Sequence, residues 1–173
     1  MAETENGADT AAAPAAGDGQ ATPRLRVLSQ YIRDLSFENI AAQKSITQSE
    51  VKPDIRVQVN IDAARREDSR FEVMLKLNVE ATAGSEKVFL LELDYAGLFH
   101  IENVQDAQLH PFLMIECPRM IFPYLRRVVG DITRDGGFPP LNIDNIDFLQ
   151  LYRQEVERRR AAQGGDGDAA GSV

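Results

Sequence analysis

The chain has 173 residues, enough for one domain with a real core but too few for two comfortable ones, so we expect a single domain. Its formal net charge is −8, and most of the acidic excess lies in the two ends, which leaves a nearly neutral body. Such a body argues against a nucleic-acid surface, because phosphate binding needs clustered positive charge. The only cysteine, Cys117, excludes an intrachain disulfide and a multi-cysteine zinc site, and it fits a reducing compartment such as the cytoplasm.

The two ends are predicted to be disordered tails around one folded domain. Residues 1–23 and 161–173 consist mainly of Ala, Gly and acidic residues, with almost no large apolar side chains, so they cannot build a core. The domain is therefore expected over residues 24–160. No basic leader followed by an apolar run is found, and no stretch approaches the ~18 apolar residues of a membrane span, so neither secretion nor membrane insertion is predicted.

Four segments alternate between apolar and polar residues with the period of two that is typical of strands. The first places Leu25, Val27, Tyr31, Leu35 and Phe37 on one face, with Leu28 and Ile32 interrupting the other. A polar connection over residues 39–50 leads to strands after Pro53, over residues 71–80 and over 87–100, and the last two are predicted to form a hairpin at Gly84. The last strand is apolar on both faces and should be covered on both. The pattern predicts an α+β fold with a four-stranded antiparallel meander.

The last third of the chain is predicted to supply a kinked long helix and a C-terminal helix, packed on one face of the sheet. One helical segment ends at Pro118 and the next runs from about Arg119 to Arg134, where Asp135-Gly136-Gly137 closes it. An extended linker, FPPLNI, follows. The final helix is predicted to carry Ile146, Phe148, Leu149, Tyr152 and Val156 and to be capped by Asn142, Asp144 or Asn145.

The stretch from His110 to Ile143 is more apolar than a single helical stripe requires. Its surplus predicts either a core with an oligomer interface or a groove for apolar polypeptide, and the pattern leaves both open. Catalytic motifs are not found. Cys117 and His110, seven residues apart, are the one pair that could act as nucleophile and base, but a buried thiol beside a helix kink is the favoured interpretation. We therefore predict no enzyme activity, no metal and no cofactor.

Four segments together resemble the SecB family of bacterial protein-export chaperones. They are RDLSFEN (33–39), KVFLLELDYAGLFHI (87–101), CPRMIFPYLRR (117–127) and GGFPPLNIDNIDF (136–148), and the resemblance covers roughly residues 25–155. It implies a homotetramer built as a dimer of dimers, with long helices between sheets. It also implies an ATP-independent chaperone, or holdase, that keeps precursors unfolded and delivers them to the SecA ATPase. A SecB-like holdase for another client, such as an antitoxin, is the alternative.

The resemblance also implies roles for individual residues. SecA would dock on Asp34, Glu38, Leu90 and Glu92. Tetramer assembly would depend on Leu91, Leu93 and Tyr95. Unfolded polypeptide would bind in a groove between the final helix, the linker and the sheet. Its residues would be Phe138, Pro139, Leu141, Ile143, Ile146 and Phe148, together with Phe122 and Tyr124.

Overall fold

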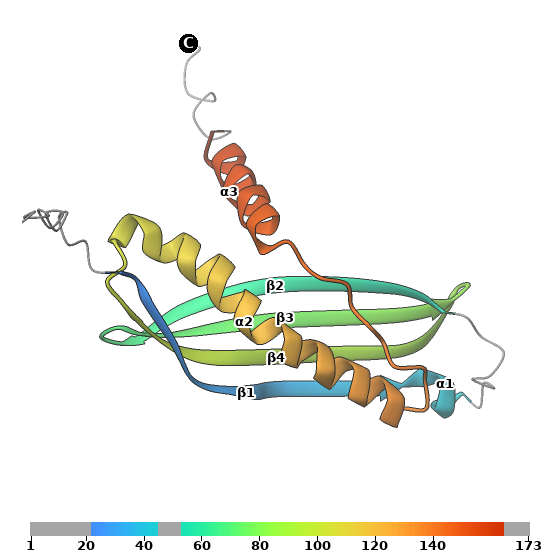
Figure 1. The fold of residues 1–173 in the computed structure, drawn as a ribbon. Coiled ribbons are helices and arrows are strands. Elements are labelled where there is room, and N and C mark those ends of the chain that lie inside the picture. Colours follow the sequence, from blue (N-terminus) through green and yellow to red (C-terminus); the bar gives the residue numbers. More distant parts are fainter. Residues whose placement is uncertain (1–21, 45–52, 165–173) are drawn as a thin grey trace, which may run out of the picture.

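The computed structural model describes residues 22–44 and 53–164. Its elements are β1 (Arg24–Asn39), α1 (Ile40–Gln43), β2 (Asp54–Glu67), β3 (Arg70–Ala83), β4 (Glu86–Glu102), α2 (Asp106–Asp135) and α3 (Phe148–Gly164). The four strands form one sheet, and α2 lies across one of its faces (Figure 1). Most of both predicted tails and part of the connection after β1 lie outside the described residues, but α3 continues beyond the predicted boundary at residue 160.

The sheet is antiparallel with the order β1-β4-β3-β2, so the predicted α+β class is confirmed and the predicted meander is wrong. The first strand pairs with β4 instead of β2. A physical reason is that β4 is apolar on both faces and is suited to a central position, whereas β2 is largely exposed and is suited to an edge. The predicted β3–β4 hairpin is confirmed: Ala83 pairs with Glu86, and Gly84 takes the left-handed φ of 61° that the turn needs.

The edge strand β1 contains two register irregularities, between Val27 and Ser29 and between Ile32 and Asp34. Each adds a residue and inverts the alternation of side chains. As a result Tyr31 lies opposite Ala96, on the other face from Val27 and its predicted companions, and Ile32 lies opposite Tyr95. The predicted single apolar face is therefore wrong at Tyr31, and the apolar residues that interrupted the polar face are explained by the irregularities.

Helix α2 is one continuous element of 30 residues, so the predicted break at Pro118 is wrong. Proline removes a backbone hydrogen bond and favours a kink, yet Pro111, Pro118 and Pro123 all lie inside this helix. Most helical stability comes from tertiary packing, and the inner face of α2 is buried on the sheet. Gly97 of β4 permits this close approach, because a Cβ there would lie 2.9 Å from the Ile121 side chain.

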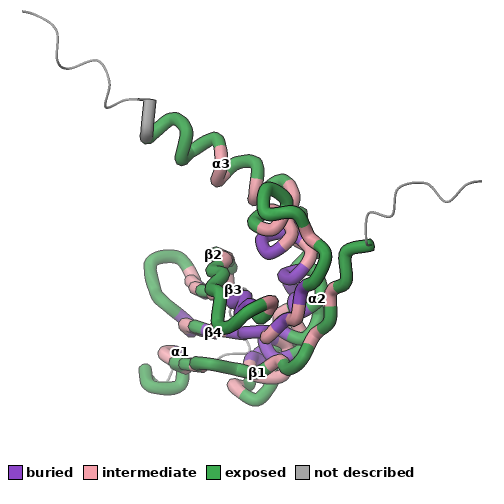
Figure 2. Tube along the Cα trace, turned by 90° about the vertical axis from the view of Figure 1, so that its left-hand side faces the viewer, coloured by how far each residue is buried: buried purple, intermediate pink, exposed green. Residues whose placement is uncertain are grey.

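The linker from α2 to α3 is fixed to the end of α2. Gly137, with φ 85°, closes the helix as predicted. The buried Thr133 hydroxyl donates to the carbonyl oxygen of Val129 and accepts from the amide of Leu141, both at 2.9 Å. The cap of α3 is Asp147, whose Oδ1 accepts from the amide of Gln150 at 3.0 Å, and not one of the three predicted residues. Helix α3 packs against α2 and projects away from the sheet, instead of lying on its face (Figures 1 and 2).

Candidate functional site

The sheet has one covered face and one open face. Alternate residues of β3 and β4 point toward α2 and form the core, where Phe89, Leu91, Leu93 and Phe99 are buried. The residues between them point to the opposite side, which none of the helices in the described part of the chain covers. Figure 2 shows the buried part of the chain gathered on β3, β4 and the inner side of α2.

The four residues predicted for SecA docking lie together on the open face of the β1–β4 pair. Glu38 is directly opposite Leu90, Ser36 is opposite Glu92, and Asp34 is opposite Asp94. Residues separated by more than fifty positions in the chain thus form one surface, which we call the acidic face and define as Asp34, Glu38, Leu90, Glu92 and Asp94.

This acidic face places like charges side by side. Asp34 and Asp94 are cross-strand partners, an arrangement that is destabilising unless a cation compensates for it. Lys76, the partner of Asp94 on β3, forms an ion pair of 2.7 Å with Asp62. A hollow of about 280 Å³ adjoins Leu90 and Glu92 and is also lined by Arg56, Gln58, Asn78, Val79, Glu80, Lys87 and Leu91. The face is therefore suited to a basic partner surface.

Most residues predicted to contact client are packed within the subunit. Phe138 lies 4.8 Å from Phe89 between ring centroids, and Phe122 meets Phe148 edge to face at 5.6 Å. Ile143 is also buried. Leu141 and Ile146 are half-buried, whereas Pro139 and Tyr124 are exposed. The linker is therefore packed on the core of the subunit, and only Pro139 and Tyr124 of the predicted client residues are exposed.

A groove lined by none of the predicted client residues lies between β2, α2 and α3. Its volume is about 660 Å³. Its apolar lining is Val59, Ile61, Met114, Leu151 and Tyr152, and its charged lining includes Asp62, Lys76, Glu155, Arg158 and Arg159. The apolar face of β2 is the sequence feature that could have indicated this groove. Ile55 and Val57 lie on that face and are exposed, so the subunit does not bury it completely.

The three residues predicted to affect assembly lie in the core of the subunit. Leu91, Leu93 and Tyr95 are buried beneath α2, so any effect on assembly acts through the packing of the sheet. The exposed apolar side chains of the stretch from His110 to Ile143 lie elsewhere. On the outer face of α2, Met120 and Tyr124 are 41% and 47% exposed and are four residues apart, so they share one stripe of the helix.

The described residues contain no reactive pair at Cys117 and His110. Cys117 is fully buried, and burial raises the pKa of its thiol to about 12, with Glu116 as a second cause. His110 faces α3 instead, with Nδ1 3.3 Å from the Tyr152 hydroxyl. No cluster of three or more potential metal-binding side chains occurs in residues 22–44 and 53–164. None of the helices in those ranges is long and apolar enough to span a membrane.

Cys117 is expected to be inert in the folded protein. Because its pKa is about 12, almost no thiolate is present at pH 8, and burial blocks access to the sulfur. We expect its reaction with a thiol reagent at pH 8 to be at least about 100-fold slower in buffer than in 6 M guanidinium chloride. A rate in buffer close to that of the unfolded chain would contradict the buried placement.

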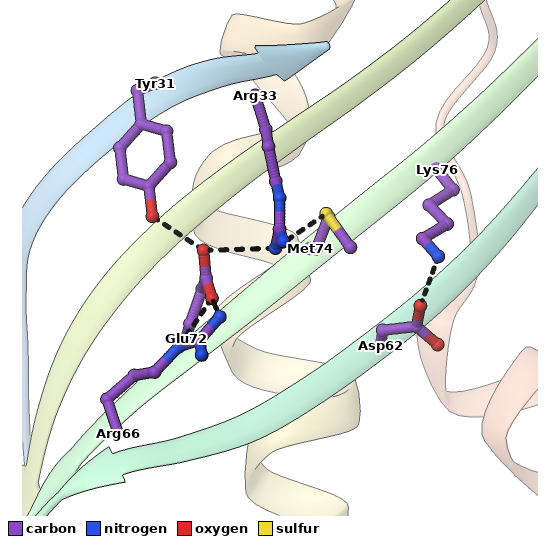
Figure 3. Close-up of polar contacts among 7 residues, drawn as sticks. All are labelled: Tyr31, Arg33, Asp62, Arg66, Glu72, Met74 and Lys76. Atoms are coloured by element: carbon purple, nitrogen blue, oxygen red, sulfur yellow. Dashed lines mark hydrogen bonds and ion pairs between the residues drawn. The ribbon is translucent and has the colours of Figure 1, made fainter.

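Glu72 anchors a polar cluster on the open face (Figure 3). Glu72 is only 6% exposed, and its carboxylate accepts hydrogen bonds from the Tyr31 hydroxyl at 2.6 Å and from Arg66 Nε at 2.7 Å. Arg33 Nη1 lies 3.6 Å from the same carboxylate. The bond from Tyr31, followed by that from Arg66, lowers the pKa of Glu72. The cluster connects β1, β2 and β3 across β4, because the small Ala96 lies opposite Tyr31.

The cluster predicts a pH-dependent stability. The folded pKa of Glu72 lies below its ordinary value of 4.5, so ionised Glu72 stabilises the fold above that pH, and the stabilisation is lost as pH falls through the folded pKa. We expect Glu72→Gln to lower the free energy of unfolding by about 1–2 kcal/mol at pH 7, with a smaller difference at pH 3. Urea unfolding at both pH values measures it, with Glu80→Gln as control. An equal difference at both pH values would contradict this role.

The protein has an α+β fold with two candidate binding surfaces. One is the acidic open face of the antiparallel sheet, and the other is the apolar groove beside the helix that covers the sheet. The family model described as "Preprotein translocase subunit SecB" matches residues 18–159. The chain belongs to the SecB family of protein-export chaperones, a family that is not an enzyme class. It is 60% identical to the protein-export protein SecB of Dinoroseobacter shibae over 93% of this chain and 94% of that protein.

Further similarities are consistent with this membership. The chain is 59% identical to the protein-export protein SecB of Roseobacter denitrificans, over 87% of this chain and 92% of the relative. Its fold resembles that of the SecB-like chaperone Rv1957 of Mycobacterium tuberculosis, solved in complex with a peptide from the HigA1 antitoxin. The TM-score is 0.61 at 15% identity, with 71% of this chain and 91% of that chain covered. At that identity the likeness concerns the fold alone.

Proposed function

We propose that the protein is an ATP-independent holdase that keeps precursor proteins unfolded in the cytoplasm and delivers them to SecA for export. The observation that carries this proposal is the presence of two separate candidate binding surfaces on the subunit. The acidic face on β1 and β4 offers a site for a basic partner, and the groove at the β2 edge of the sheet offers apolar surface for polypeptide. Export relatives identical at 52–60% support the same assignment.

Client binding would work by mass action. A protein that binds the unfolded state lowers its free concentration, and so slows folding and aggregation without nucleotide. The groove lined by Val59, Ile61, Met114, Leu151 and Tyr152 supplies the apolar contact area, and the exposed Pro139 of the linker is proposed as a further contact. In this proposal the half-buried Leu141 and Ile146 contact client directly. The buried residues position the linker from within the core, namely Phe122, Phe138, Ile143 and Phe148.

The proposed assembly is a homotetramer, a dimer of dimers. It would cover Met120 and Tyr124 on the outer face of α2, which the subunit leaves exposed. A tetramer would also gain avidity, because one long unfolded chain can occupy several grooves at once. Native mass spectrometry tests the assembly: we expect a mass about four times 19.2 kDa. A monomer at micromolar concentration would contradict it.

The holdase activity is tested by refolding. A denatured precursor is diluted into buffer with and without the protein, in the absence of ATP, and its return to the native state is followed by tryptophan fluorescence. Because the chaperone itself has no tryptophan, the signal reports the client alone. We expect delayed refolding and, separately, direct binding of SecA. Failure of both would exclude the export role, whereas delayed refolding without SecA binding would favour a holdase for a non-export client.

A further inference from the structure

The α3 wall of the groove between β2, α2 and α3 is apolar at one end and charged at the other. Its lining begins with Leu151 and Tyr152, continues with Glu155 and ends with Arg158 and Arg159. Glu155 is three or four residues from each of the other four, so all five share one face of the helix. The arginines therefore lie about two turns, or roughly 10 Å along the helix axis, beyond the apolar residues.

Two guanidinium groups share one carboxylate at the charged end. Arg159 Nε donates to Glu155 Oε1 at 2.8 Å, and Arg158 Nη2 donates to Glu155 Oε2. One negative charge thus compensates for two positive charges, and the side chains of Arg158 and Arg159 are 79% and 61% exposed. Because each guanidinium carries five N–H donors, both keep donors for a further acceptor.

The lining contributed by β2 and β3 adds no charge that could compensate for the arginines. Asp62 Oδ2 and Lys76 Nζ form an ion pair of 2.7 Å, so their charges cancel (Figure 3). Asn60 and Gln154, which also line the groove, are uncharged. The groove therefore combines apolar contact area with a net positive charge at one end.

We propose that Arg158 and Arg159 determine client specificity, so that the groove prefers unfolded segments in which an acidic residue lies close to apolar residues. This inference rests on the proposed function and adds the class of client. An extended polypeptide advances about 3.3 Å per residue, so a carboxylate about three residues beyond the apolar side chains reaches the arginines. The planar carboxylate matches the donor geometry of a guanidinium group.

The overall charge of the protein acts in the opposite direction. The formal net charge is −8, so at long range the chain attracts a basic peptide and repels an acidic one. A preference for an acidic peptide must therefore have a local source. At about 0.15 M salt the screening length is about 8 Å, which weakens the long-range part and leaves the contacts within the groove.

The test compares two labelled peptides that have blocked termini and the same central run of Leu, Val and Tyr. One carries glutamate on both sides of the run and the other carries lysine, so that either direction of binding presents the charge to the arginines. Fluorescence anisotropy at about 0.15 M salt measures both Kd values. We define the preference as the Kd of the lysine peptide divided by that of the glutamate peptide, and expect roughly five for the unaltered protein.

Removal of the two guanidinium groups should abolish this preference. The test variant is Arg158→Gln with Arg159→Gln, and the matched control is Arg153→Gln with Arg160→Gln, which changes the net charge equally. Arg153 and Arg160 are exposed on the opposite side of the same helix and do not line the groove. We expect the control to keep the preference of the unaltered protein.

Removal of the shared carboxylate should have the opposite effect. Glu155→Gln leaves both positive charges to the client, so we expect the preference to rise at least about twofold. Glu157→Gln is its control, because Glu157 is an exposed acid of α3 outside the groove lining, and it should leave the preference unchanged.

Several outcomes would overturn the specificity. A preference of one or less in the unaltered protein would do so, as would an equal loss in the test variant and in the Arg153 and Arg160 control. Delayed precursor refolding without binding of either peptide would also do so, because a second copy of the chain would then cover the groove. If neither peptide binds and precursor refolding is not delayed, the proposed function itself has failed.

Discussion

Replacing Glu38 and Glu92 together by lysine is expected to weaken SecA binding by about 100-fold, or ~2.7 kcal/mol. Both carboxylates lie on the acidic face, and each reversal turns an attraction for a basic surface into a repulsion. The groove proposed for client lies at the β2 edge of the sheet and is lined by neither residue, so the delay of precursor refolding should persist. Isothermal titration calorimetry with SecA, at low and high salt, measures the loss. The unaltered protein should also bind more weakly as salt rises.

The matched control reverses the same number of charges away from that face. Glu67 and Glu157 are exposed acids at the β2–β3 turn and on α3, and changing both to lysine leaves the net charge equal to that of the test variant. We expect less than a threefold effect on SecA binding from this control. Equal losses in both variants would mean that overall charge governs the affinity. Unchanged client holding and unchanged cellular function in the test variant would favour the non-export alternative.

Replacing Phe89 by alanine is expected to lower the free energy of unfolding by about 3–5 kcal/mol. Its ring is buried between Phe37 and Phe138, so truncation leaves a cavity at the junction of β1, β4 and the linker. Urea unfolding followed by circular dichroism gives the value. Leu28→Ala is the control, because Leu28 is 39% exposed on the edge strand, and we expect it to cost less than about 1 kcal/mol. A loss below 1 kcal/mol for Phe89→Ala would contradict the aromatic cluster.

Local patterns predicted the elements whose structure depends on near neighbours. The turn at Gly84 needs a left-handed residue between two alternating segments, and the stop at Gly137 needs one after a helix; both are visible in a few residues. The SecB resemblance of residues 33–39 and 87–101 brought together the docking residues, and the cross-strand pairing of Glu38 with Leu90 is consistent with that grouping. Their role in binding SecA stays a prediction.

Other features depended on contacts that no local pattern contains. The prolines of α2 predicted a break, and burial of that helix on the sheet overrode them. The first irregularity of β1 moved Tyr31 to the open face, where its hydroxyl meets Glu72 of a strand that is not its neighbour. The lining of the groove between β2, α2 and α3 could not be predicted, because it comes from four elements, β3 included, whose relative positions were unknown.

By itself the sequence determined the class of fold, the family and the absence of an intrachain disulfide, because these follow from composition, short-range periodicity and motif spacing. Tertiary structure alone decided the order of the strands, the continuity of α2 and the packing of Phe138, Ile143 and Phe148 into the subunit. The physical reason is that burial is shared among distant residues. A phenylalanine in the linker is equally suited to a client or to the core, and only the position of Phe37 and Phe89 beside it determines which one it contacts.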